Sequence, residues 1–106
     1  MMYKILLCCS SALTTSMLVA NLKRECEAQN IPAMIWACGE TGVAMSWPDA
    51  DIVLLAPQIR YFKELVQKEV DGKIPVQVID GMDFSTLNAK NILKQAIDAI
   101  EENKGK

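Results

Sequence analysis

The residues best placed to do chemistry are Cys9 and the hydroxyl-rich stretch that follows it. The apolar run Ile5-Leu6-Leu7-Cys8 is typical of a buried strand, and Cys9 stands where a loop begins. The stretch from Ser10 to Ser16 leads directly into an amphipathic helix. A helix N-terminus presents unpaired N–H groups and the positive end of the macrodipole, so it attracts anions. We therefore interpret Cys9 as a nucleophile facing an oxyanion, with phosphate favoured.

A thiol at such a position is expected to ionise more readily than a free thiol, and the thiolate is the nucleophile. The chain contains no histidine. It therefore has no Ser-His or Cys-His dyad, no imidazole general base and no phosphohistidine of its own. Covalent chemistry at Cys9 would depend on dipoles and backbone amides for activation.

The other three cysteines are predicted to be buried thiols that act as small hydrophobic residues: Cys8, Cys26 and Cys38. Adjacent residues of an extended chain point to opposite sides, so only one of Cys8 and Cys9 can face the loop, and we expect it to be Cys9. No CxxC pair and no zinc-like spacing is present, so neither a metal nor a cofactor is expected. A thiol redox protein that uses Cys8 and Cys9 is a weak interpretation, because disulfides between adjacent cysteines are strained.

Composition narrows the class of protein. The 106 residues are expected to form one domain, 51% hydrophobic and 23% charged. The net charge of −2 and the lack of a basic stripe argue against nucleic-acid binding. No signal peptide is recognised, and no run approaches the roughly 20 apolar residues that span a bilayer. The expected location is the cytoplasm.

The hydrophobic pattern predicts four strands that alternate with helices. The strands are expected at 2–8, 31–37, 52–56 and 75–80, and the second is expected at an edge. Helices are predicted to begin near 14–16, at 57 and near 85–86, with irregular helical turns over 41–47 and loops at 48–51 and 81–84. Hydroxyl side chains are expected to cap the first and last helices. In the helix that follows Pro57, the buried face is expected to consist of Phe62, Leu65 and Val66. Residues 101–106 are expected to form a fraying, charged tail.

This order of elements predicts an α/β fold: a four-stranded parallel sheet with helices on both faces, in three layers. In such sheets ligands bind beyond the carboxyl ends of the strands, where the strand order reverses. The loop after the first strand should lie there, with the loop at Pro57-Gln58 and the loop from Asp80 to Phe84 beside it. Pro57, Gln58, Tyr61 and Asp80 are therefore candidates for the border of the site, although Pro57 can simply start a helix and Asp80 can simply cap a loop.

Three separate segments carry a resemblance to a known family. The stretch from Cys9 to Val19, the stretch from Ala50 to Ile59 with Tyr61, and Val78-Ile79-Asp80 together resemble the IIB component of the lactose/cellobiose (chitobiose) class of the bacterial phosphoenolpyruvate-dependent sugar phosphotransferase system. The resemblance extends over essentially the whole chain. It implies a single IIB phosphocarrier domain over residues 1–106, with a phosphatase-like Cys loop after the first strand.

The resemblance also implies a reaction and partners. The family's phosphorylated cysteine falls on Cys9, which would accept a phosphoryl group from a phosphohistidine of a IIA protein and pass it to a sugar bound by the membrane-embedded IIC transporter. The family's phosphate-binding loop falls on Ser10, Ser11, Ala12, Leu13, Thr14, Thr15 and Ser16. Many relatives carry Gly where this chain has Ala12. The sugar stays open among cellobiose, chitobiose, lactose and other β-glucosides, and the domain is expected to be a monomer.

The rival enzymatic interpretation is a low-molecular-weight phosphatase or arsenate reductase, which also uses a Cys loop after the first strand. Those enzymes follow the pattern Cys-x5-Arg, and the Arg position holds Thr15 here. The loop then lacks the bidentate guanidinium clamp on phosphate. Only Asp80 or Asp83 could supply the general acid for the leaving group. The sequence therefore favours a phosphoryl relay over a hydrolase.

Overall fold

The computed structural model describes residues 2–9, 12–39 and 42–104, with the main chain alone at 12–15. The elements in chain order are β1 (Tyr3–Cys8), α1 (Ala12–Ala28), β2 (Ala33–Cys38), α2 (Val43–Ser46), η2 (Trp47–Asp49), β3 (Ile52–Leu55), η3 (Pro57–Phe62), α3 (Lys63–Val70), β4 (Val76–Val78), α4 (Gly81–Ser85) and α5 (Ala89–Lys104). The labels η2 and η3 mark 3-10 helices.

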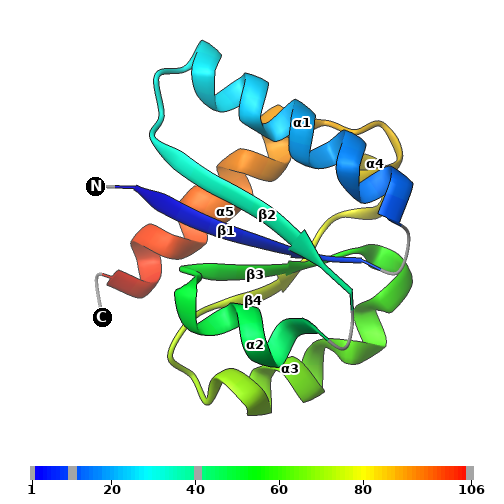
Figure 1. The fold of residues 1–106 in the computed structure, drawn as a ribbon, viewed down its shortest axis with the longest axis vertical. Helices are drawn as coiled ribbons and strands as arrows, with labels where there is room; N and C mark the ends of the chain where they lie inside the picture. The colour runs from blue at the N-terminus through cyan, green and yellow to red at the C-terminus, as the bar shows by residue number, and fades with distance from the viewer. Residues whose placement is uncertain (1, 10–11, 40–41, 105–106) are drawn as a thin grey trace.

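The four strands form one parallel sheet in the order β2-β1-β3-β4. Figure 1 shows α1 and α5 against one face of the sheet and α2 and α3 against the other. Because helices cover both faces, β3 and the last four residues of the other inner strand, β1, are buried and apolar, as is common in parallel strands. The predicted three-layer α/β fold is therefore confirmed, and so is the edge position of β2.

The strand order reverses between β1 and β3. From β1 the chain crosses to β2 on one side, and then returns to place β3 and β4 on the other side. The carboxyl ends of the two inner strands lie together, because the Ala56 N–H donates a hydrogen bond of 3.0 Å to the Cys8 carbonyl. Open parallel sheets bind ligands at this kind of reversal. The segment that begins at Cys9 leaves the sheet at this point.

The core lies on both sides of β1 and β3. Its largest fully buried side chains are Ile5, Leu6, Leu7, Leu18, Leu22, Ile52, Leu54, Leu55, Ile59, Ile79, Ile92 and Leu93. The predicted buried face of α3 was wrong at Leu65, which is 60% exposed, whereas Val66 and Val70 are buried. Residues four apart share a helix face, so the pair Val66 and Val70 turns Leu65 outward.

Several predicted helix boundaries were also wrong. The first helix begins at Ala12, so Thr14, Thr15 and Ser16 lie inside its first turns and are not its caps. Residues 81–84, expected as a loop, belong to α4. The last helix begins at Ala89, where the Asn88 side-chain oxygen accepts a hydrogen bond of 3.2 Å from the Asn91 N–H.

The expected fraying tail is helical as far as Lys104. It is held to the sheet near the first strand, because the Tyr3 hydroxyl donates a hydrogen bond of 2.6 Å to the Glu101 carboxylate. This bond raises the pKa of Tyr3, with burial and the charge of Glu101 as smaller causes. Among the helices of residues 2–9, 12–39 and 42–104, none is both long and apolar enough to cross a membrane.

Candidate functional site

Cys9 occupies the first position after β1, at the reversal of the strand order. Its N–H donates a hydrogen bond of 3.2 Å to the Cys38 carbonyl at the end of β2. The carbonyl of the preceding residue, Cys8, accepts from Ala56 at the end of β3. Main-chain bonds to both neighbouring strands therefore fix where the chain leaves the sheet.

Cys9 is more enclosed than a thiol on an open loop would be. Only 7% of the residue is exposed, and Cys9 belongs to the hydrophobic core. The helix α1 begins three residues later, at Ala12. In any α-helix the first four N–H groups have no partner within the helix. The site thus combines a mostly buried cysteine with the start of a 17-residue helix nearby in the chain.

Most of the predicted phosphate-binding residues lie outside the part of the chain whose side chains the structure describes. Ser10 and Ser11 lie outside the described residues, and the main chain from Ala12 to Thr15 forms the first turn of α1. Ser16 is exposed on the same helix. A ring of main-chain donors around a phosphoryl group therefore stays a prediction.

Cys38 was predicted to be a buried thiol, and it is instead half-buried. It lies directly opposite Cys8 in the register of β1 and β2. A hydrogen bond with the Cys8 thiol lowers the pKa of Cys38, against the opposing effect of burial. Sequence reasoning missed this pair, because the register of two strands separated by a helix is not written in local spacing.

The candidates after β3 lie on η3, which begins at Pro57. Pro57 is at the start of this helix, as predicted, and is half-buried. Gln58 is exposed, and Tyr61 is 68% exposed. These residues follow the strand next to β1, so the fold brings their segment to the same edge of the sheet as Cys9.

Asp80 caps the helix after β4. Its carboxylate accepts hydrogen bonds from the N–H groups of Met82 at 3.1 Å and Asp83 at 3.3 Å. These N–H groups belong to the first turn of α4, and an Asp in the N-cap position satisfies donors of this kind. Of the two interpretations that the sequence left open for Asp80, the structure supports a capping function.

Asp83 has a structural contact as well. Its side-chain oxygen accepts a hydrogen bond of 3.1 Å from the Asn91 amide, which joins α4 to α5. The two carboxylates that a phosphatase could have used as a general acid both hold the segment after β4 in place. This observation weighs against the hydrolase interpretation.

Replacing Asp80 by Ala is expected to lower the free energy of unfolding by about 1 kcal/mol, the usual effect of losing an N-cap. Asp80→Asn keeps an accepting oxygen and should retain most of that stability. Chemical denaturation of both variants measures the difference. The matched control is Asp98→Ala, since Asp98 is an exposed residue of α5 and its loss should change stability by less than about 0.5 kcal/mol. Equal stability of Asp80→Ala and the unmodified chain would contradict the capping function.

Exposed apolar side chains occur on the segments that follow all four strands, and Met45 in α2, after β2, is 87% exposed. Met17 in α1 is 50% exposed, Tyr61 in η3 is 68% exposed and Met82 in α4 is 71% exposed. Each of these segments starts at the carboxyl edge of the sheet. Of Met17, Tyr61 and Met82, sequence reasoning singled out only Tyr61. The five residues of α4 are too few to give a periodic pattern from which the exposure of Met82 can be read.

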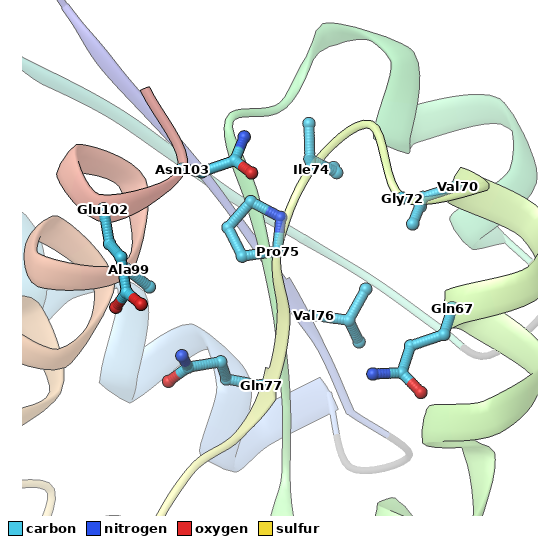
Figure 2. Close-up of a pocket in the computed structure, with 10 residues that line it drawn as sticks. All are labelled: Gln67, Val70, Gly72, Ile74, Pro75, Val76, Gln77, Ala99, Glu102 and Asn103. Carbon is cyan, nitrogen blue, oxygen red and sulfur yellow. The ribbon is translucent and has the colours of Figure 1, made fainter. Parts of the chain in front are cut away.

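A polar hollow of about 480 Å³ lies elsewhere, between α3, β4 and α5. Figure 2 shows Gln67 of α3, Gln77 of β4 and Glu102 of α5 among the residues that line it. Gly72, Ile74 and Pro75, just before β4, also line it, so it lies toward the amino end of that strand. It is therefore separate from the edge that holds Cys9.

No group of three or more His, Cys, Asp or Glu side chains that could hold a metal ion occurs within the part of the chain that the structure describes. The four cysteines are thiols.

Comparison with known proteins agrees with this fold. A family model described as "PTS system, Lactose/Cellobiose specific IIB subunit" matches residues 4–95. The oligo-beta-mannoside-specific EIIB component of the PTS system of Bacillus subtilis (strain 168) is 39% identical over 100 residues, which cover 93% of this chain and 97% of that protein.

Two solved structures share the fold. The cellobiose-specific phosphotransferase IIB component from Borrelia burgdorferi superposes with a TM-score of 0.82 and 35% identity, covering 97% of this chain and 95% of that one. The lactose-specific IIB component domain from Streptococcus pneumoniae gives a TM-score of 0.83 at 16% identity, over 93% and 98% of the two chains, and shows likeness of fold alone. With a family match over most of its length and relatives covered almost end to end, this chain belongs to the lactose/cellobiose-specific IIB family of the phosphoenolpyruvate:carbohydrate phosphotransferase system.

Proposed function

We propose that Cys9 is the phosphoryl carrier of this IIB component and that residues 1–106 act as a single phosphocarrier domain. The observation that carries the proposal is the position of Cys9. It is the first residue after β1, at the reversal of strand order, three residues before a long helix begins. Nucleophiles and phosphates use this place in an α/β sheet because unpaired N–H groups converge there.

The absence of histidine fits a relay of this kind. A phosphohistidine on a IIA partner would supply the phosphoryl group: the Cys9 sulfur attacks phosphorus in line as the P–N bond breaks, forming phosphocysteine and leaving the donor's imidazole. A sugar hydroxyl then attacks the same phosphorus as the P–S bond breaks, and the thiolate is restored. Positioning and charge stabilisation are the main demands, and N–H groups from Ser10 to Thr15 are the proposed donors.

The small exposed fraction of Cys9 sets a condition on both partners. Donor and acceptor must approach along the same edge of the sheet, because each has to reach the same sulfur in turn. We place the docking face for the IIA protein and the IIC transporter on the segments that carry Met17, Tyr61 and Met82, whose side chains are at least 50% exposed. Exposed apolar side chains of this kind are typical of protein interfaces. A monomer in the cytoplasm fits this exchange.

The relatives point to the class of sugar. The names of the similar proteins refer to oligo-beta-mannoside, cellobiose and lactose, and each of these sugars contains a β-glycosidic link. We propose a β-linked oligosaccharide as the final acceptor. Binding of the sugar itself belongs to the IIC transporter.

A Cys-loop phosphatase or arsenate reductase is the alternative. Two features oppose it: Thr15 stands where the phosphate-binding Arg of those enzymes would be, and Asp80 and Asp83 both hold the segment after β4. Without a guanidinium clamp and a general acid, phosphocysteine should hydrolyse slowly. Slow hydrolysis suits a carrier, which must keep its phosphoryl group until the acceptor arrives.

Intact mass after incubation with phosphoenolpyruvate, the general phosphotransfer proteins and a cognate IIA protein tests the proposal. The expected result is a single gain of about 80 Da, one phosphoryl group. Reaction with an aryl phosphate tests the alternative in parallel. Brisk turnover of the aryl phosphate without a stable mass gain would overturn the relay and favour the phosphatase.

A further inference from the structure

The thiols of Cys8 and Cys38 form a pair that the phosphoryl relay does not use. The two residues are Cα partners in the parallel register of β1 and β2. Neighbouring strands lie about 4.8 Å apart, and a disulfide accepts Cα separations of about 4.4 to 6.8 Å. The two positions are therefore close enough for a covalent bridge without a change of register.

The two side chains also lie on the same side of the sheet, because the residues are direct partners in a parallel pair of strands. The Cys8 thiol is buried and donates a hydrogen bond of 3.7 Å to the Gly39 carbonyl, the residue directly after Cys38. Cys38 is half-buried, and Gly42 packs against it: a Cβ placed on Gly42 would lie 3.1 Å from the Cys38 Cβ and 3.9 Å from its sulfur. The lack of a side chain at Gly42 thus leaves room beside the Cys38 sulfur.

The environments of the cysteines differ in a way that favours this pair. The hydrogen bond with Cys8 lowers the pKa of Cys38, which increases its thiolate fraction. Cys26 is buried in α1, and its burial and the neighbouring charge of Glu25 raise its pKa. Thiols that sense oxidants are commonly accessible, of low pKa and next to a second, resolving thiol.

We propose that Cys8 and Cys38 are an oxidisable dithiol that closes a reversible disulfide between β1 and β2, next to Cys9. With hydrogen peroxide as oxidant, the Cys38 thiolate attacks one oxygen, the O–O bond breaks, and hydroxide leaves as water once protonated. The sulfur of Cys8 then attacks the resulting sulfenic sulfur, its proton and the departing hydroxide form a second water, and the S–S bond closes.

The disulfide would act on the site through a main-chain contact. The Cys9 N–H donates to the Cys38 carbonyl, so the bond that draws the two sulfurs together also pulls on the residues that fix Cys9. We expect the oxidised protein to accept phosphoryl groups about tenfold more slowly or worse, since small misplacements of a reacting atom are costly. This second step rests on the proposed function, whereas the disulfide itself does not.

The test of the disulfide needs two serine substitutions. Trypsin leaves Cys8 and Cys9 on one peptide, because no Lys or Arg separates them, and it leaves Cys26 and Cys38 together for the same reason. Peptide mapping of the unmodified chain would therefore not show which cysteine of each peptide is bridged. The variant Cys9→Ser/Cys26→Ser keeps only Cys8 and Cys38, so any disulfide within it must join these two. Hydrogen peroxide should lower its intact mass by about 2 Da, through loss of two hydrogens, and dithiothreitol should reverse the change. The same variant carrying Cys38→Ser is the control and should not lose this mass.

The unmodified chain, treated in the same way, is a second control, needed in case the double variant does not fold. It should also lose about 2 Da and two titratable thiols. Absence of the loss in both proteins overturns the proposal. Loss in the unmodified chain but not in the folded Cys9→Ser/Cys26→Ser variant also overturns it, because Cys9 or Cys26 would then be a partner.

The effect on the relay is measured with Cys26→Ser, which keeps Cys9. Reduced and peroxide-treated samples are compared for the rate of phosphoryl uptake, and Cys26→Ser/Cys38→Ser receives the same peroxide to reveal direct oxidation of Cys9. Slowing confined to the protein with Cys38 supports the coupling, and equal rates or equal slowing in both proteins overturn it. If reduced protein takes up no phosphoryl group, the proposed function fails while the mass result for the disulfide still stands.

Discussion

Cys9→Ser is expected to abolish the gain of one phosphoryl group from the IIA donor. The hydroxyl of serine is far less acidic than a thiol, and a serine nucleophile needs a neighbouring base to activate it. The chain has no histidine to provide that base. The substitution is close to isosteric, so the nearly buried position should still fold around it. Intact mass with the complete phosphotransfer mixture reads the result directly.

Cys26→Ser is the matched control for this experiment. Cys26 is also a buried cysteine, but it lies in the second half of α1, away from the carboxyl edge of the sheet. It should retain phosphoryl uptake as long as circular dichroism shows a folded protein. Uptake by Cys9→Ser at the unmodified level would remove Cys9 from the relay, and loss of uptake in a folded Cys26→Ser protein would show that the effect is not specific to Cys9.

Leu54→Ala is expected to cause the largest loss of stability among the substitutions considered. Leu54 is fully buried in β3, which pairs with β1 on one side and with β4 on the other. Truncating a buried leucine usually costs about 2 to 5 kcal/mol, because transfer energy is lost and a cavity remains. Whole domains have only about 5 to 15 kcal/mol of stability. Thermal unfolding should therefore move down by about 10 °C or more.

Leu65→Ala provides the control with the same change of side chain. Leu65 is 60% exposed on α3, although the sequence pattern predicted it to be buried. Its truncation should change the free energy of unfolding by less than about 0.5 kcal/mol. Similar losses in the two variants would mean that α3 presents a different face to the sheet from the one described.

The sequence was most informative where a pattern repeats over many residues. Continuous apolar runs indicated β1 and β3, since strands covered on both faces need apolar side chains at every position. Spacing was less reliable in short elements. The prediction failed at α4, because five residues capped by Asp80 contain too little periodicity to separate a helical turn from a loop.

The candidate site, like the fold, could be predicted only in part from the sequence. The sequence by itself determined that a cysteine follows the first strand, that a helix comes next, and that no histidine is present to share the chemistry. These properties depend on residues that are neighbours in the chain. They sufficed to indicate the fold class and the family.

Only the tertiary structure decided the properties that depend on contacts between distant segments. The order β2-β1-β3-β4, the pairing of Cys8 with Cys38 and the enclosure of Cys9 each bring together residues from different elements. The physical reason is that strand order and register follow from how all the helices and strands bury their apolar faces at once. Spacing along one segment fixes what that segment can bury, and packing of the whole chain selects its neighbours.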